Sequence, residues 1–176
     1  MAQWTRSAGA LREPDRGEVD AAEARARFPI GKPAGGLEAI REELYSVMWD
    51  DVGILRNAEG LARARARLRE MRSALAATGI GATDLRYNLT WHDWLNLDSL
   101  ITVSGAILAA ADARKESRGA HFREDYPATG DLARSAFSRV RYAGVAATPS
   151  AEDRFDIAWQ PVAFTRVRPG QSLIAA

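Results

Sequence analysis

The chain has 176 residues, 47% of them hydrophobic and 27% charged, which suits one soluble globular domain with extensions and argues against general disorder. Its 24 basic and 23 acidic residues nearly cancel, so the overall charge gives no long-range attraction for nucleic acid or anionic lipid. Cysteine is absent, which excludes disulfides and thiolate-bound zinc or iron–sulfur clusters within this chain and fits a cytoplasmic location.

Residues 1–35 are expected to form an irregular lead-in or linker. They combine Pro14, Pro29 and Pro33 with several glycines and mixed charges, a composition that offers little apolar surface to bury. These residues also contain no apolar stretch of signal-peptide length. We therefore predict loose structure before the first helix.

Three amphipathic helices are predicted between residues 36 and 130. Their apolar residues recur at intervals of three and four, the spacing that gathers side chains on one face of a helix. The three stripes are Leu37, Ile40, Leu44, Val47 and Met48; Leu61, Ala64, Leu68, Met71 and Leu75; and Leu97, Leu100, Ile101, Ser104, Ile107, Leu108 and Ala111. Short connections between such helices favour an antiparallel bundle. The fold class is therefore predicted to be mainly α.

The longest apolar run lies near residues 100–111 and belongs to the third predicted helix. It is interrupted by Thr102, Ser104 and Gly105. The run is too short to span a bilayer, so no direct membrane insertion is expected.

Residues 131–176 are predicted to form an extended tail that packs on the bundle. In the stretch RFDIAWQP, Phe155, Ile157 and Trp159 alternate with Asp156 and Ala158, which is the pattern of a β-strand. The stretch VAFTRVR that follows could supply a partner strand. The tail would then contain one small β-hairpin.

Three candidate sites along the chain have weak support. The run ARARARLREMR (residues 62–72) could bind phosphates, but alternate arginines diverge around a helix, so no nucleic acid binding is expected. His92 and His121 lack the spacing of a metal site. The glycines at 79 and 81 resemble part of a dinucleotide fingerprint, but a helix precedes them, and they read better as a helix stop.

The segment KESRGAHFREDYP (residues 115–127) is the densest group of polar residues and follows directly on the third predicted helix. Arg118 and Arg123 offer planar donors for carboxylate or phosphate, and His121 can donate or accept a proton near neutral pH. An alternative interpretation is a helix terminus with an internal network of ion pairs to Glu116, Glu124 and Asp125. The residue types alone leave both interpretations open.

Two ordered motifs in the chain resemble one protein family. The stretch ESRGAHFREDYP (116–127) is similar to a segment in the C-terminal helical domain of succinate dehydrogenase and fumarate reductase flavoprotein subunits and of L-aspartate oxidases. Upstream, MWDDVGILRNAEGL (48–61) resembles the passage between two helices of the same domain, and Asn96-Leu97 with Leu100 resembles its next helix. The resemblance covers roughly residues 35–130.

The resemblance implies a three-helix, spectrin-like bundle that packs against a flavin-binding domain or subunit, which would hold FAD and most of the residues for dicarboxylate chemistry. Arg118, His121 and Arg123 would lie at that interface or near the active site, with Arg56 as a supporting member. No catalytic, cofactor-binding or metal-binding residue is assigned to this chain, which we expect to be inactive alone.

The resemblance also allows for further partners. An iron–sulfur subunit could complete the electron path and hold the chain at the inner face of the membrane. The alternative function is an autonomous helical module for protein–protein interaction without a redox role.

Overall fold

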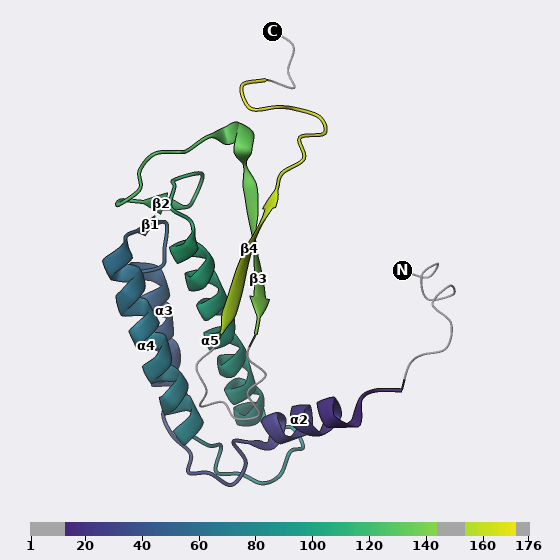
Figure 1. Cartoon of the computed structure of the whole chain (residues 1–176). Helices are drawn as coiled ribbons and strands as arrows, with labels where there is room; N and C mark the ends of the chain where they lie inside the picture. The colour runs from purple at the N-terminus through teal and green to yellow at the C-terminus, as the bar shows by residue number, and fades with distance from the viewer. Residues whose placement is uncertain (1–12, 144–153, 172–176) are drawn as a thin grey trace.

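The computed structural model describes residues 13–143 and 154–171, which fold into a mainly helical body with a small antiparallel sheet (Figure 1). The helices, in chain order, are α2 (Arg16–Arg27), α3 (Leu37–Asp50), α4 (Ala58–Ala77) and α5 (Leu89–Ala113). A 3-10 turn follows at Leu132–Arg134. The strands are β1 (Leu55–Arg56), β2 (Phe122–Arg123), β3 (Ala136–Tyr142) and β4 (Phe155–Pro161).

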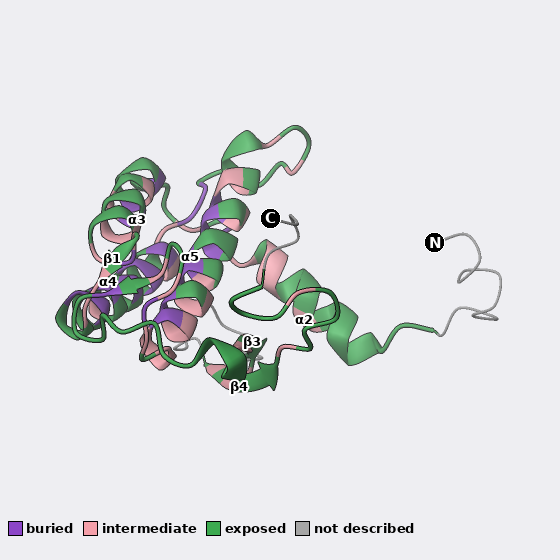
Figure 2. Ribbon diagram, turned by 90° about the horizontal axis from the view of Figure 1, so that it is seen from above, coloured by how far each residue is buried: buried purple, intermediate pink, exposed green. Residues whose placement is uncertain are grey.

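Helices α3, α4 and α5 pack against one another and enclose the core. Figure 2 shows the buried residues on the sides of these helices that face each other. Asn57 and Asn88 cap the N-termini of α4 and α5, because their side-chain oxygens accept the N–H groups of Gly60 and Trp91 at 2.8 and 2.9 Å. The largest completely buried apolar side chains are Trp94, Leu44, Leu61, Met71, Leu75, Leu97, Ile101 and Pro29. Leu100 and Ile107, which the third predicted stripe also included, are 39% and 45% exposed, so this part of the prediction is wrong.

The prediction of an irregular lead-in is wrong for residues 16–27, which form α2. Asp15 caps this helix by accepting the Gly17 N–H at 2.7 Å, and its alanines favour helix despite the flanking prolines and glycines. Helix α2 buries no residue completely. It is held at its C-terminal end, where Arg25 pairs with Asp98 of α5 and the Trp91 indole donates to the Ala26 carbonyl at 2.7 Å.

The expected hairpin in the tail exists, but its partner strand is a different one. Strand β4 pairs antiparallel with β3, with Val140 opposite Ile157 and Tyr142 opposite Phe155. Residues 162–168, which were predicted as the partner, form no strand. Both strands of the hairpin contact α5. Alternation in β3 was overlooked because arginines at 139 and 141 occupy one of its faces.

Helix α5 has 25 residues and is long and apolar enough, by length and composition alone, to cross a membrane. The expectation that this apolar region is too short to span a bilayer is therefore wrong, because the helix that contains it is long enough. Its apolar residues supply the core, where Trp94, Leu97 and Ile101 are almost completely buried. The same buried face carries Asp98, which is paired with Arg72 of α4.

Candidate functional site

Two short strands bring three of the four predicted site residues together. Strand β1, in the connection between α3 and α4, pairs in parallel with β2, which lies in the polar loop (residues 114–127) that follows α5. The register places Arg56 opposite Arg123. His121 directly precedes β2 and contacts Arg56, which lies 65 residues earlier in the chain. The site therefore forms only when both connections lie at the same end of the helices.

Arg123 is the buried centre of the polar loop. Its side chain is 0% exposed and forms a two-pronged ion pair with Asp125, with N–O distances of 2.8 and 2.7 Å. The same guanidinium donates to the carbonyls of Ala111, Asp112 and Arg114 at 3.0, 3.3 and 3.4 Å. Donation from Arg123 lowers the pKa of Asp125 to about 2. Arg123 thus caps the C-terminus of α5, and its charge is balanced inside the chain.

Ser117 and Asp125 fix the path of the polar loop. The Ser117 hydroxyl is buried, accepts the Arg123 N–H at 2.8 Å and donates to the Tyr126 carbonyl at 2.8 Å. Asp125 also accepts the Ala58 N–H at 3.1 Å, at the first turn of α4, where a negative charge is favourable. The loop is therefore attached to both α4 and α5.

Arg56 and His121 form a close pair that, unlike the pair of Arg123 with Asp125, contains no carboxylate. Arg56 Nη1 lies 2.5 Å from His121 Nδ1, and Arg56 Nε donates to the Val52 carbonyl at 3.1 Å. Since arginine can only donate, Nδ1 must be the acceptor, and the ring proton is on Nε2, which lies 3.4 Å from the Arg114 carbonyl. Burial, and then the charge of Arg56, lower the pKa of His121. Both the contact and the burial therefore favour the uncharged form of His121.

Arg118 takes part in a separate network. Its Nη2 donates to Glu116 at 2.6 Å and its Nη1 to the Ser135 hydroxyl at 2.8 Å, while its buried Nε has no hydrogen-bond partner among the described residues. Glu116 also accepts from Arg114 Nη1 at 2.5 Å. Gly130, at φ 72°, closes over this carboxylate, because a Cβ there would lie 2.4 Å from a Glu116 oxygen. Arg118 therefore connects the polar loop to the residues that lead into β3.

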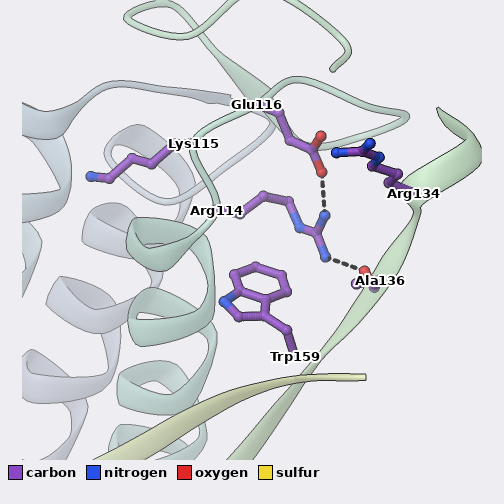
Figure 3. A pocket seen from close by; sticks show the side chains of 6 residues that line it. All are labelled: Arg114, Lys115, Glu116, Arg134, Ala136 and Trp159. Carbon is purple, nitrogen blue, oxygen red and sulfur yellow. Dashed lines mark hydrogen bonds and ion pairs between the residues drawn. The ribbon is translucent and has the colours of Figure 1, made fainter. Parts of the chain in front are cut away.

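An open polar pocket of about 220 Å³ lies between the end of α5 and the hairpin (Figure 3). The Arg114 guanidinium stacks 4.7 Å from the centre of the Trp159 ring and donates to the Ala136 carbonyl at 2.9 Å. Most of the polar side chains that line the pocket thus already have hydrogen-bond or ion-pair partners within the chain. The lining residues are Arg114, Lys115, Glu116, Arg134, Ala136 and Trp159.

The structure brings Arg56, His121 and Arg123 together, but the sequence did not distinguish their environments. Of the three acids in the alternative interpretation, Glu116 pairs with Arg118 and Asp125 pairs with Arg123, whereas Glu124 accepts a hydrogen bond from Asn57. Ser117 was overlooked, since a serine among charged residues gives no signal of burial. The contact of Trp159 with Arg114 could not be found either, because it depends on which strand pairs with β4.

The other candidate sites have structural explanations. In the arginine run, Arg63, Arg65 and Arg72 pair with Asp51, Asp112 and Asp98, respectively. These carboxylates offset the positive charge that phosphate binding would need. A Cβ added at Gly79 would lie 2.4 Å from the Lys32 carbonyl oxygen. The glycine therefore allows the backbone after α4 to pack closely against Lys32.

The two histidines lie at opposite ends of α5. His92 is in the first turn and His121 follows the last one, so they are separated by roughly 35 Å. Within residues 13–143 and 154–171, no group of three His, Cys, Asp or Glu side chains is placed to hold a metal ion.

Comparisons with known proteins agree with the resemblance seen in the motifs. The family model described as fumarate reductase flavoprotein C-term matches residues 41–173. The 8-methylmenaquinol:fumarate reductase flavoprotein subunit of Wolinella succinogenes is 38% identical over 88 residues, which are 50% of this chain and 14% of that protein. L-aspartate oxidase 1 of Ralstonia nicotianae is 38% identical over 88 residues, 50% of this chain and 15% of the oxidase.

Among solved structures, Mycobacterium smegmatis Sdh1 in complex with UQ1 matches with a TM-score of 0.78 and 24% identity, over 91% of this chain and 26% of that one. At this identity the likeness shows the fold alone. The chain thus spans only a small part of the length of the relatives it matches. The family match over residues 41–173 confirms the resemblance: the chain belongs to the family of C-terminal domains of succinate dehydrogenase and fumarate reductase flavoproteins.

Proposed function

We propose that this chain acts as the C-terminal helical domain of an FAD-dependent oxidoreductase for dicarboxylates, and that it packs against a flavin-binding domain or subunit. FAD would be held by that partner and not by this chain. The observation that carries the proposal is the family match over residues 41–173, because the relatives that share this part are flavoprotein subunits. We expect no turnover by this chain alone.

The arrangement we infer is a three-helix, spectrin-like bundle over residues 36–130, preceded by a lead-in over 1–35 and followed by a tail over 131–176 that packs on the bundle. Mutual packing of α3, α4 and α5, and the contacts of the hairpin with α5, support this division. A rigid body of this kind can present the polar loop at one end in a fixed orientation.

The polar end of the bundle is proposed to face the flavin-binding domain, with Arg56, Arg118, His121 and Arg123 at or behind the interface. Their environments suggest different tasks. Arg123 is completely buried and would support the loop, whereas Arg56 and His121 are partly exposed and can reach a partner. Complementary charge at such an interface would fix the orientation of the two bodies.

Further partners follow from the same proposal. An iron–sulfur subunit would accept electrons from the flavin, and the assembly would work in the cytoplasm at the inner face of the membrane. This chain would reach the membrane through its partners, with α5 retained in the core, where its buried face lies. No nucleic acid takes part.

The proposal is tested by expressing this chain together with the flavin-binding part of the flavoprotein. The two polypeptides should copurify as one flavin-coloured complex that oxidises succinate or reduces fumarate with an artificial electron carrier. Each polypeptide alone should show little or no activity. If the two remain separate and the flavin-binding part is fully active without this chain, the chain is an autonomous interaction module instead.

A further inference from the structure

Arg56 is a partly buried cation whose charge is not balanced within the described part of the chain. Its contacts there are the Val52 carbonyl and the ring nitrogen of His121, both of which are uncharged. Burial and the nearby charge of Arg123 lower its pKa, with no carboxylate acting in the opposite direction. Arginine stays protonated under these conditions, so the charge remains. A desolvated charge of this kind is unfavourable unless a counter-charge is supplied.

The neighbouring arginine shows that the same strand pair can balance a charge. Arg56 and Arg123 lie opposite each other in the β1–β2 register, an arrangement that is unfavourable for like charges. Arg123 is neutralised by Asp125, which holds it with two hydrogen bonds. Glu124 is the next acid along the loop, but it accepts from Asn57 at 2.6 Å.

The surroundings of Arg56 have the composition of a protein interface. Ile54 and Leu55 are 62% and 61% exposed, and Phe122, the register partner of Leu55, is 37% exposed. Exposed aliphatic and aromatic residues around a desolvated arginine are typical of the central part of protein–protein contacts. These residues are held by backbone pairing and not by a flexible loop, so the surface is formed before any partner binds.

We propose that an Asp or Glu side chain of the flavin-binding partner pairs with Arg56, while Ile54, Leu55 and Phe122 make apolar contacts around this ion pair. The inference rests on the proposed function, since it takes the flavin-binding domain as the occupant. Charge complementarity selects a carboxylate: the position offers a donor fork and a neutral histidine, and it repels cations. A free dicarboxylate has the same chemistry, and the experiments below separate the two sources.

Zero-length cross-linking with a carbodiimide tests the proposal directly, because this reagent joins an amine only to a carboxylate that touches it. The variant Arg56→Lys supplies the amine and keeps the charge. In the complex it should become linked to an Asp or Glu of the flavin-binding polypeptide, and mass spectrometry identifies the site. The matched control, Arg63→Lys, should link within the chain, since Arg63 lies 2.7 Å from Asp51.

The chain alone provides a second test that needs no partner. Without the flavin-binding polypeptide, the Arg56→Lys variant should give no internal cross-link at this position, whereas Arg63→Lys should still give one. An internal cross-link at position 56 would overturn the proposal, because it would reveal a counter-charge inside the chain.

Removal of the charge gives the quantitative test. Arg56→Met should weaken assembly with the flavin-binding polypeptide at least about tenfold, while Arg63→Met should leave it unchanged. If the complex forms normally with Arg56→Met but its KM for succinate rises, the carboxylate is the substrate and the docking proposal is wrong. An Arg56→Lys complex that forms without any cross-link between position 56 and the flavin-binding polypeptide overturns this inference alone. Failure of the wild-type chain to bind any flavin-binding polypeptide overturns the proposed function as well.

Discussion

Arg56 and Arg123 occupy opposite positions in one two-residue strand pair, yet the chain treats them differently. Arg123 is completely buried, with a carboxylate and three carbonyls around its guanidinium. Arg56 is partly exposed and contacts one carbonyl and a neutral histidine. Because burial of a charge is tolerated when its counter-charge is present, Arg123 belongs to the architecture of this chain and Arg56 is open to another molecule. The predictions below test this difference.

The largest effect is expected for Arg123→Met. The substitution removes the donors to the end of α5 and leaves Asp125 without its partner, so it should lower the free energy of unfolding by about 3 kcal/mol. Asp125 is 28% exposed and can regain water, which keeps the loss at the low end for a broken buried ion pair. Urea unfolding followed by circular dichroism measures it. The exposed Arg63→Met control should change stability by less than about 1 kcal/mol, and a similar loss in both would refute the distinction.

A smaller loss is expected for Ser117→Ala, which tests whether the loop around Arg123 depends on one hydroxyl. The change leaves the Arg123 N–H and the Tyr126 carbonyl without this partner. Stability should fall by about 1 to 2 kcal/mol in the same unfolding experiment. Ser99→Ala, which removes an exposed hydroxyl that donates to the Leu95 carbonyl of its own helix, is the control. Equal stability of Ser117→Ala and the wild-type protein would contradict the role given to Ser117.

The pair of Arg123 with Asp125 should also determine part of the acid sensitivity. The pKa of Asp125 is about 2 in the folded chain, against an ordinary value of 3.8. Its carboxylate therefore stabilises the fold above pH 4, and this contribution is lost as the pH falls from about 4 to about 2. Asp125→Asn should flatten the pH dependence of stability in that window. If stability depends on pH in this window in the same way in the variant and in the wild-type protein, the pair does not form in solution.

The smallest effect on stability is expected for Arg56→Met in the chain alone. Loss of two hydrogen bonds is offset by removal of a desolvated charge next to Arg123, so the net change should stay within about 1 kcal/mol. The clearer signal is electrostatic. Because the charge of Arg56 contributes to the lowered pKa of His121, this pKa should rise toward its ordinary value in the variant. Proton NMR of the His121 ring measures the change, and an unaltered pKa would refute the contact.

Much of the fold could be predicted because it follows from local patterns. Apolar residues at intervals of three and four located α3, α4 and α5, and most of these residues form the core, although Leu100 and Ile107 are exposed. Helix α2 was missed because composition was weighed above the capping residue Asp15 and the alanines that follow. The partner of β4 was misassigned, since the choice between two nearby segments depends on packing against α5 and not on either segment alone.

The sequence motifs named the residues of the candidate site but not their environments. The motifs pointed to Arg56, Arg118, His121 and Arg123, but nothing in the sequence tells which arginine will find a carboxylate. That outcome depends on the β1–β2 register, which joins two distant connections. Asp125 follows Arg123 by two residues in the polar loop, and its carboxylate pairs with that guanidinium.

The pairing of β1 with β2 has a consequence for the order of folding. Arg56 and His121 meet although they are 65 positions apart in the chain, and the residues between them include the whole of α4 and α5. Closing so long a segment carries an entropic cost that only the preformed packing of both helices can offset. During synthesis the first strand must therefore wait, unpaired, until the second has left the ribosome. We expect the surface that recognises a partner to be completed last, so that unfinished chains cannot assemble prematurely.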